Sequence, residues 1–219
     1  PAFKDRRYMT VGGRPLFCVF KPDKIPDLPN FLETWRTLAM SEGLPGLHLV
    51  AMTWDESVDP IAMGFDGATP QPRLESNPWI SRRQPIRWVL DRLRRAAGLP
   101  TFWPWTFLQD DLSRFSTHPE GYHPLIIHDW DNTPRSGANG VVLTGSTVDR
   151  FEQMVRHAVC IASKRPPSSA LIFLRSWNEW AEGNALEPDA RDGRAYLEAL
   201  RRGLGPDSPT ATGNADPSA

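Results

Sequence analysis

Residues 170–189 read ALIFLRSWNEWAEGNALEPD, an apolar run followed at once by acids and indoles. The run from residue 170 to residue 174 predicts a short strand buried on both faces, as in a parallel sheet. Two carboxylates, Glu179 and Glu182, follow it. Acids and indoles just past the carboxyl end of a strand are typical of a sugar site, because carboxylates transfer protons and rings stack on pyranose faces. The same residues would also serve to cap the strand and seal a barrel rim.

The surrounding chain alternates between strand and helix patterns. We expect helices beginning at Asn30, Pro85, Ser146 or Thr147, and Asp192, and strands at 16–20, 47–51, 61–65, 122–128 and 170–174. This alternation predicts an α/β fold with a parallel sheet, either a (β/α)8 barrel or a doubly wound open sheet. An open sheet usually has a glycine-rich phosphate turn after its first strand, and here Lys21-Pro-Asp23 stands in that place.

Composition describes one soluble globular domain over residues 1–205. The chain has 219 residues, 40% hydrophobic content and a net charge of −1, which gives no attraction to nucleic acid. No run approaches the ~18 apolar residues of a membrane span, and we expect a cytoplasmic protein. Residues 206–219 have no apolar period and predict a disordered tail. Cys18 and Cys160 stand in apolar contexts and predict buried free thiols.

Two segments have open interpretations. The loop at 68–84 is rich in Pro and Arg, and a loop of that length usually covers a site or has a function. The segment TFWPWTF at 101–107 is either an aromatic plug in the core or a wall on which sugars stack. Between them, the helix from Pro85 has an apolar face formed by Ile86, Val89, Leu90 and Leu93.

The segment WNEWAEGNALEPD at 177–189 resembles the C-terminal signature of the WbsX family. These bacterial proteins occur with surface-polysaccharide genes and are described as glycosyltransferases or as glycoside hydrolase family 99-like. Further matches are GRAYLE at 193–198, WDNTPR at 130–135, and FKDRRY at 3–8 with GRPL at 13–16. The resemblance implies a (β/α)8 TIM-type barrel. It also implies that this chain, which begins at Pro1, covers roughly the C-terminal half to two-thirds and needs the missing N-terminal part of the same barrel as its partner.

Glycosidic chemistry needs an acid for the leaving oxygen and a base or nucleophile at the sugar. If their loop is helical, Glu179 and Glu182 face the same way with about 5–6 Å between their Cβ atoms, so their charges interact. The resemblance to family 99 endo-α-mannosidases implies that Glu179 is a base at the sugar 2-hydroxyl, through an anhydro-sugar intermediate, and that Glu182 is the acid/base. We expect no cofactor and no metal, since His123 and His128 form a poor ligand pair.

An oligosaccharide or polysaccharide substrate needs polar and aromatic side chains around this pair. Asp131, Asn132 and Arg135 have the chemistry of hydroxyl or phosphate binders, or of a salt bridge in a turn. The segment FDGATPQPR at 65–73 lacks an acidic residue that the family often shows there, which leaves substrate binding in doubt. The full set of candidate binding residues is Trp54, Asp66, Trp130, Asp131, Asn132, Arg135, Trp177, Asn178, Trp180 and Glu187.

We therefore expect a carbohydrate-active enzyme that acts on a glycosidic bond during bacterial polysaccharide assembly. One alternative is a sugar-nucleotide-dependent glycosyltransferase; Asp129-Trp-Asp131 has the form of the metal–nucleotide motif that such enzymes use. The other alternative is a non-catalytic glycan-binding barrel.

Overall fold

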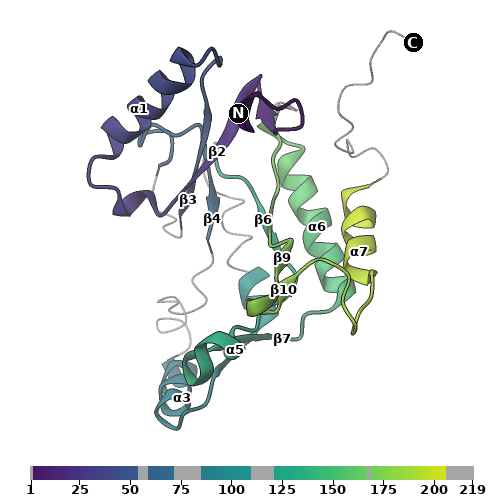
Figure 1. Ribbon diagram of the computed structural model, residues 1–219. Helices are drawn as coiled ribbons and strands as arrows, with labels where there is room; N and C mark the ends of the chain where they lie inside the picture. The colour runs from purple at the N-terminus through teal and green to yellow at the C-terminus, as the bar shows by residue number, and fades with distance from the viewer. Residues whose placement is uncertain (1, 54–58, 72–84, 110–120, 167–168, 206–219) are drawn as a thin grey trace.

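The computed structural model describes residues 2–53, 59–71, 85–109, 121–166 and 169–205 (Figure 1). The predicted tail and most of the predicted loop at 68–84 lie outside these ranges.

The strands are β1 (Thr10–Val11), β2 (Arg14–Phe20), β3 (His48–Thr53), β4 (Gly67–Pro70), β5 (Thr101–Pro104), β6 (Leu125–Ile127), β7 (Val141–Thr144), β8 (Phe173–Arg175), β9 (Asn178–Glu179) and β10 (Asn184–Ala185). The α-helices are α1 (Leu28–Ser41), α3 (Pro85–Ala96), α5 (Thr133–Ser136), α6 (Val148–Ala162) and α7 (Ala195–Leu204). Short 3-10 helices are η1 (Ala2–Lys4), η2 (Pro22–Lys24), η3 (Gly137–Asn139) and η5 (Trp180–Glu182).

Five parallel strands form an α/β half-barrel sheet in the order β2, β3, β4, β6, β8. A parallel bridge between Ala68 and Tyr122 joins β4 to the segment that leads into β6. The registers place Leu16 opposite His48, Val50 opposite Gly67, and Leu125 opposite Phe173. Strands β5 and β7 form a separate parallel pair. The alternation of strand and helix was therefore predicted correctly, and the architecture is consistent with a barrel-type fold.

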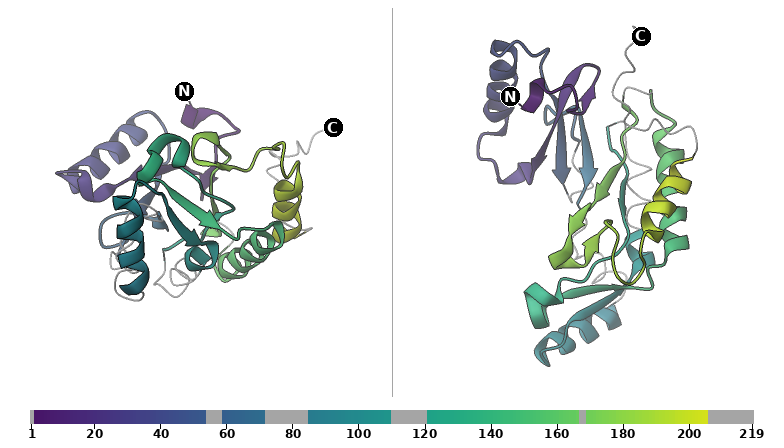
Figure 2. Two further views of the ribbon diagram at one scale, coloured as in Figure 1. Left: turned by 90° about the horizontal axis from the view of Figure 1, so that it is seen from below. Right: turned by 45° about the vertical axis from the view of Figure 1, so that its right-hand side comes forward.

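Helices flank these strands on two sides. Figure 1 shows α1 on one flank and α6 with α7 on the other, with the parallel strands between them. Figure 2 shows α3, α5, β5 and β7 gathered together beyond the lower ends of these strands. Each flank has its own apolar core, one built around Leu32 and Leu49 and the other around Phe151 and Ile127. Among the described residues, no helix has the length and apolar character that a membrane span requires.

Helix α6 follows the sequence prediction closely. Thr147 is its N-cap, and the Thr147 hydroxyl accepts a hydrogen bond from the Arg150 N–H at 3.3 Å. The predicted apolar face is buried at Phe151, Met154, Val155, Ala158 and Ala162. The aromatic segment at 101–107 is largely a core plug, since Trp103 and Trp105 are buried.

The predicted caps of two other helices were wrong. Helix α1 begins earlier than expected, because the Asp27 side chain accepts the Asn30 N–H at 3.3 Å and Asn30 lies inside the helix. Helix α7 begins at Ala195, with Arg194 as its N-cap, rather than at Asp192. The Arg194 side chain makes no capping hydrogen bond.

Two predicted strands were also wrong. Residues 61–65 form turns, in which the Gly64 N–H donates to the Ile61 carbonyl at 2.9 Å. The strand expected at 170–174 begins only at Phe173 and is half-buried. Strand β8 pairs with β6 alone in the described part of the chain, so its other edge has no neighbour there to bury it.

One burial prediction was wrong as well. The Cys160 thiol lies on an exposed position of α6, although neither Cys18 nor Cys160 is in a disulfide. The apolar face of α3 is exposed, with Ile86 at 78% and Leu93 at 62%. Sequence periodicity gives the direction of a helix face, but it does not say whether a neighbour covers that face.

Candidate active site

The candidate site lies at the carboxyl ends of three neighbouring strands. Gln71 comes directly after β4, Trp130 follows β6 by a short loop, and Arg175 is the last residue of β8. Parallel strands end at one edge of their sheet, so these side chains meet there, where α/β barrels place their active sites.

Arg175 connects all three strand ends. Its Nη1 donates to the Gln71 Oε1 at 3.3 Å, and its Cζ lies 4.4 Å from the centroid of the Trp130 ring. Its Nη2 lies 3.7 Å from Oε2 of Glu182. Gln71 and Trp130 are themselves buried, so Arg175 packs against side chains that are held in the core.

Glu182 is a buried carboxylate with two arginine partners. Its side chain is 8% exposed, and its other oxygen pairs with Nη2 of Arg135 from α5. Buried carboxylates need such partners, because an unpaired charge away from water is strongly unfavourable. Two guanidinium groups favour the ionised form of Glu182.

The local backbone explains how Glu182 reaches this position. The Asp131 N–H donates to the Glu182 carbonyl at 2.8 Å, which holds η5 against the loop after β6. Gly183 then takes a left-handed conformation with φ of 56°, and a Cβ there would lie 3.2 Å from Asp131. Only glycine combines that conformation with so close an approach.

Glu179 comes from the adjoining hairpin. It ends β9, pairs across the hairpin with Asn184 of β10, and is half-buried. The Ser176 hydroxyl accepts the Glu179 N–H at 3.2 Å and donates to the Asn184 carbonyl at 2.6 Å. Glu179 is the N-cap residue of the 3-10 turn η5, and Glu182 is the last residue of that turn.

Two exposed indoles stand beside the pair. Trp177 and Trp180 are 53% and 54% exposed, an unusual state for side chains of this size. Trp180 donates from Nε1 to Oε2 of Glu187 at 2.8 Å, which orients its ring. Asn178 lies between them and is also exposed.

Other predicted binding residues have structural contacts. Trp130 is 2% exposed and offers no open ring face, contrary to a stacking role in this state. The Asp131 Oδ1 accepts from both the N–H and the hydroxyl of Thr133. Asn132 is buried, and its Oδ1 accepts the Val141 N–H at 2.7 Å. Asp131 and Asn132 therefore shape the loop, while Arg135 extends to Glu182.

Asp66 lies at the opposite end of the sheet. It precedes β4, accepts the Leu49 N–H at 2.9 Å and pairs with Arg14 at 2.7 Å. The prediction placed Asp66 after a strand, and that was wrong because 61–65 is not one. Trp54, the remaining predicted residue, is outside the described residues.

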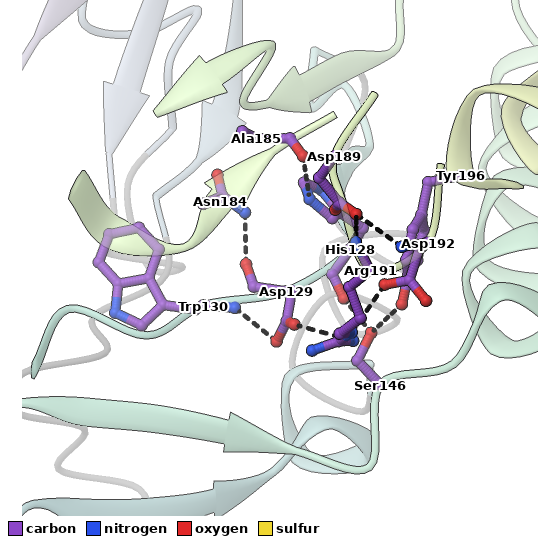
Figure 3. A network of polar contacts seen from close by, with 10 residues as sticks. All are labelled: His128, Asp129, Trp130, Ser146, Asn184, Ala185, Asp189, Arg191, Asp192 and Tyr196. Carbon is purple, nitrogen blue, oxygen red and sulfur yellow. Dashed lines mark hydrogen bonds and ion pairs between the residues drawn. The ribbon is translucent and has the colours of Figure 1, made fainter. Parts of the chain in front are cut away.

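A second polar network surrounds Asp129 (Figure 3). Its Oδ1 accepts the Trp130 backbone N–H at 2.9 Å, and its Oδ2 lies 3.9 Å from Nη2 of Arg191. Arg191 also pairs with Asp192 at 2.9 Å. Burial raises the pKa of Asp129, and the Trp130 N–H opposes that effect. His128 donates from Nε2 to the Ala185 carbonyl at 2.9 Å, and burial lowers its pKa. This network fixes the loop before α7 to the end of β6.

Sequence reasoning did not select Arg175, Gln71 or Ser176. One feature of the sequence could have identified Arg175 as a candidate site residue, because it is a charged residue at the end of an apolar run. In the described part of the chain, no cluster of three or more His, Cys, Asp or Glu residues is arranged to hold a metal ion.

The chain is similar in sequence to curated bacterial proteins. The "Uncharacterized protein WxcX" of Xanthomonas campestris pv. campestris, in strains B100 and ATCC 33913, is 30% identical over 218 residues. The match covers 99% of this chain and 30% of the relative, so the chain spans under a third of that protein.

One solved structure supports the barrel-type fold. A glycoside hydrolase-like protein aligns with a TM-score of 0.59 at 17% identity, over 92% of this chain and 57% of that one. The family 99 endo-α-mannosidase from Bacteroides thetaiotaomicron aligns with a TM-score of 0.49 at 16% identity, over 90% of this chain and 55% of that one. The family model described as "Glycosyltransferase WbsX" matches residues 1–200. The chain belongs to the WbsX glycosyltransferase family.

Proposed function

We propose that this chain is part of a carbohydrate-active enzyme that acts on glycosidic bonds in bacterial cell-surface polysaccharide biosynthesis. The observation that carries the proposal is the buried Glu182 beside Glu179 at the carboxyl end of β8. Trp177 and Trp180 add exposed rings for an oligosaccharide. The family and the printed description of a glycoside hydrolase-like neighbour support the same class.

In the favoured mechanism both glutamates are catalytic. Glu179 removes the proton of the sugar 2-hydroxyl, whose oxygen bonds to C1 to form an anhydro sugar, while Glu182 protonates the leaving oxygen and the glycosidic C–O bond breaks. Water then adds at C1 and opens the anhydro sugar; Glu179 returns its proton to the 2-oxygen and Glu182 regains one from the water, so both glutamates are back in their starting states. Glu182 cannot donate a proton while it is ionised, so its pair with Arg135 opens when the substrate binds. Arg135 is 58% exposed and can turn toward solvent or substrate.

We propose that further strands complete the barrel around the described sheet. Strands β2 and β8 are the outer parallel strands of the described sheet. The glycoside hydrolase-like neighbour is much longer than this chain, which covers 57% of it. We therefore expect catalysis from the intact protein.

Glutamine substitution tests this function. Glu179→Gln and Glu182→Gln keep shape but remove proton transfer, so each should lower kcat about 10²- to 10⁴-fold. The kcat of the double variant should be only slightly below that of the slower single variant, because both residues act in the same catalytic step. A glycosyl fluoride needs no proton at its leaving group and should rescue Glu182→Gln but not Glu179→Gln.

The control is Glu198→Gln, an exposed glutamate of α7 that should keep full activity. Rescue of Glu179→Gln in place of Glu182→Gln would show that the two glutamates have the opposite roles. Full activity in both single variants would show that neither glutamate is catalytic. An intact protein that binds saccharides but never cleaves or transfers them would be a glycan-binding barrel.

A sugar-nucleotide-dependent glycosyltransferase is the second candidate, favoured by the family description. The carboxylates of Asp129 and Asp131 have different partners, Arg191 and Thr133, so they do not converge as a metal-binding pair would. Calorimetry should decide: saccharide binding in EDTA favours the hydrolase-like mechanism, and tight metal-dependent nucleotide-sugar binding favours the transferase.

A further inference from the structure

Arg175 contacts several parts of the candidate site at once. Its Cζ lies over the Trp130 ring, 4.4 Å from the ring centroid, while Nη2 lies 3.7 Å from Oε2 of Glu182 and Nη1 donates to Oε1 of Gln71 at 3.3 Å. A planar guanidinium group can stack and donate at the same time, whereas a lysine ammonium acts as a point charge. The side chain is therefore constrained in three directions.

The partners that the structure describes for Arg175 are buried side chains. Gln71, Trp130 and Glu182 are each less than one-tenth exposed. The Arg156–Glu152 pair on α6, in contrast, lies on the surface, with Arg156 58% exposed. Contacts between desolvated groups are stronger than those at the surface, where water competes.

We propose that Arg175 is a positioning residue, which fixes the Glu182 carboxyl group beside Trp130. The inference rests on the proposed function insofar as Glu182 is taken as catalytic. The described charged groups that face Glu182 are Arg175 from β8 and Arg135 from α5. The acids of the adjoining segments are Asp131, whose Oδ1 is taken by Thr133, and Glu179.

Two consequences follow from this arrangement. A nearby positive charge lowers a carboxyl pKa by roughly 1–3 units, so removing Arg175 should raise the pKa of Glu182. A misplacement of about 1 Å at a reacting group can cost roughly 10²-fold in rate, so the same change should lower kcat more than it raises KM.

The experiment uses the intact protein with Arg175→Met, Arg175→Lys and the surface control Arg156→Met. Carbon-13 NMR of labelled glutamate follows the titration of Glu182, assigned by its absence in Glu182→Gln. We expect the Glu182 pKa to rise by about one unit or more in Arg175→Met, and to remain near the wild-type value in Arg175→Lys and Arg156→Met.

Kinetics provides the second readout. In Arg175→Met, kcat/KM should fall about 10- to 100-fold, and the limb of the pH profile that reports Glu182 should move to higher pH. Arg175→Lys keeps the charge but loses the stacking, so its kcat should still fall about tenfold without a shift of that limb. If Arg175→Met does not fold, Arg175→Lys carries this part of the test.

An unchanged Glu182 titration in folded Arg175→Met would overturn the inference, as would wild-type kcat in Arg175→Lys. The NMR titration does not need turnover. If the wild-type protein acts on no saccharide, the proposed function fails, while the titration still decides whether Arg175 controls Glu182.

Discussion

The indole N–H of Trp180 donates to the Glu187 carboxylate at 2.8 Å, across the β9–β10 hairpin. The Trp180 ring remains 54% exposed, so Glu187 orients a ring that is open to solvent. Glu187 was predicted to bind substrate directly, and its observed contact is with the ring beside the glutamate pair.

This contact predicts graded losses in saccharide affinity. Glu187→Gln keeps an acceptor and should bind almost as well as the wild type. Glu187→Ala frees the indole and should weaken binding by on the order of 1 kcal/mol, about fivefold in Kd. Trp180→Ala should lose more, because the stacking surface is gone. Calorimetry measures all three, with Glu198→Ala as the exposed control. Equal affinity in Glu187→Ala and the wild type would contradict the role of Glu187.

Trp105 predicts a large effect on stability. It is fully buried and donates from Nε1 to the Ile127 carbonyl at 3.2 Å, joining the helical turn at 105–109 to β6. Trp105→Ala should lower the free energy of unfolding by about 3–5 kcal/mol, through the cavity and the lost hydrogen bond. Urea unfolding measures this effect. Phe102→Ala, at a 38% exposed position of β5, should cost much less; equal costs would refute the plug assignment.

His123 predicts how stability depends on pH. Its pKa is lowered from 6.5 to about 3, mainly by burial and then by Arg165 and His48. The folded state therefore takes up this proton only at a lower pH than the unfolded state does. The contribution of neutral His123 to the free energy of unfolding is fully present above pH 6.5 and is lost as pH falls toward 3.

Between pH 6.5 and pH 5 this group should remove about 2 kcal/mol from the free energy of unfolding. His123→Gln keeps an acceptor for the Arg165 Nη1, which lies 3.1 Å from the His123 Nδ1, and should flatten that slope. His157→Gln, on an exposed position of α6, should leave the slope unchanged. Equal slopes in His123→Gln and the wild type would show that His123 is not protonated on unfolding.

The apolar face of α3 predicts self-association when residues 1–219 are produced alone. Ile86, Val89, Leu90 and Leu93 are all exposed on one side of this helix, and such patches promote aggregation. The double variant Leu90→Gln/Leu93→Gln should reduce light scattering at equal concentration. Leu99→Gln, at an isolated exposed leucine, is the control and should not. A monomeric wild-type fragment with a sharp melt would refute this prediction.

Local signals in the sequence were enough for some elements. Helix α6 was predictable because its cap at Thr147 and its apolar face depend on residues within a few positions of one another. The position of the glutamate pair, in the segment just past β8, was predictable for the same reason. The strand at 61–65 could not be rejected this way, since its apolar residues also suit the turn that Gly64 closes with φ of 91°.

The sequence by itself determined the alternation of strands and helices, the apolar face of α6, and the grouping of Glu179 and Glu182 after one strand. Only the tertiary structure decided that Arg175 meets Gln71, 104 residues away, and that Asp66 lies at the opposite end of the sheet from Glu182. Periodicity and capping depend on neighbours along the chain, whereas these contacts depend on which strands lie side by side. The order of the strands is set by the burial of whole faces of the sheet, so it cannot be read from any one short segment.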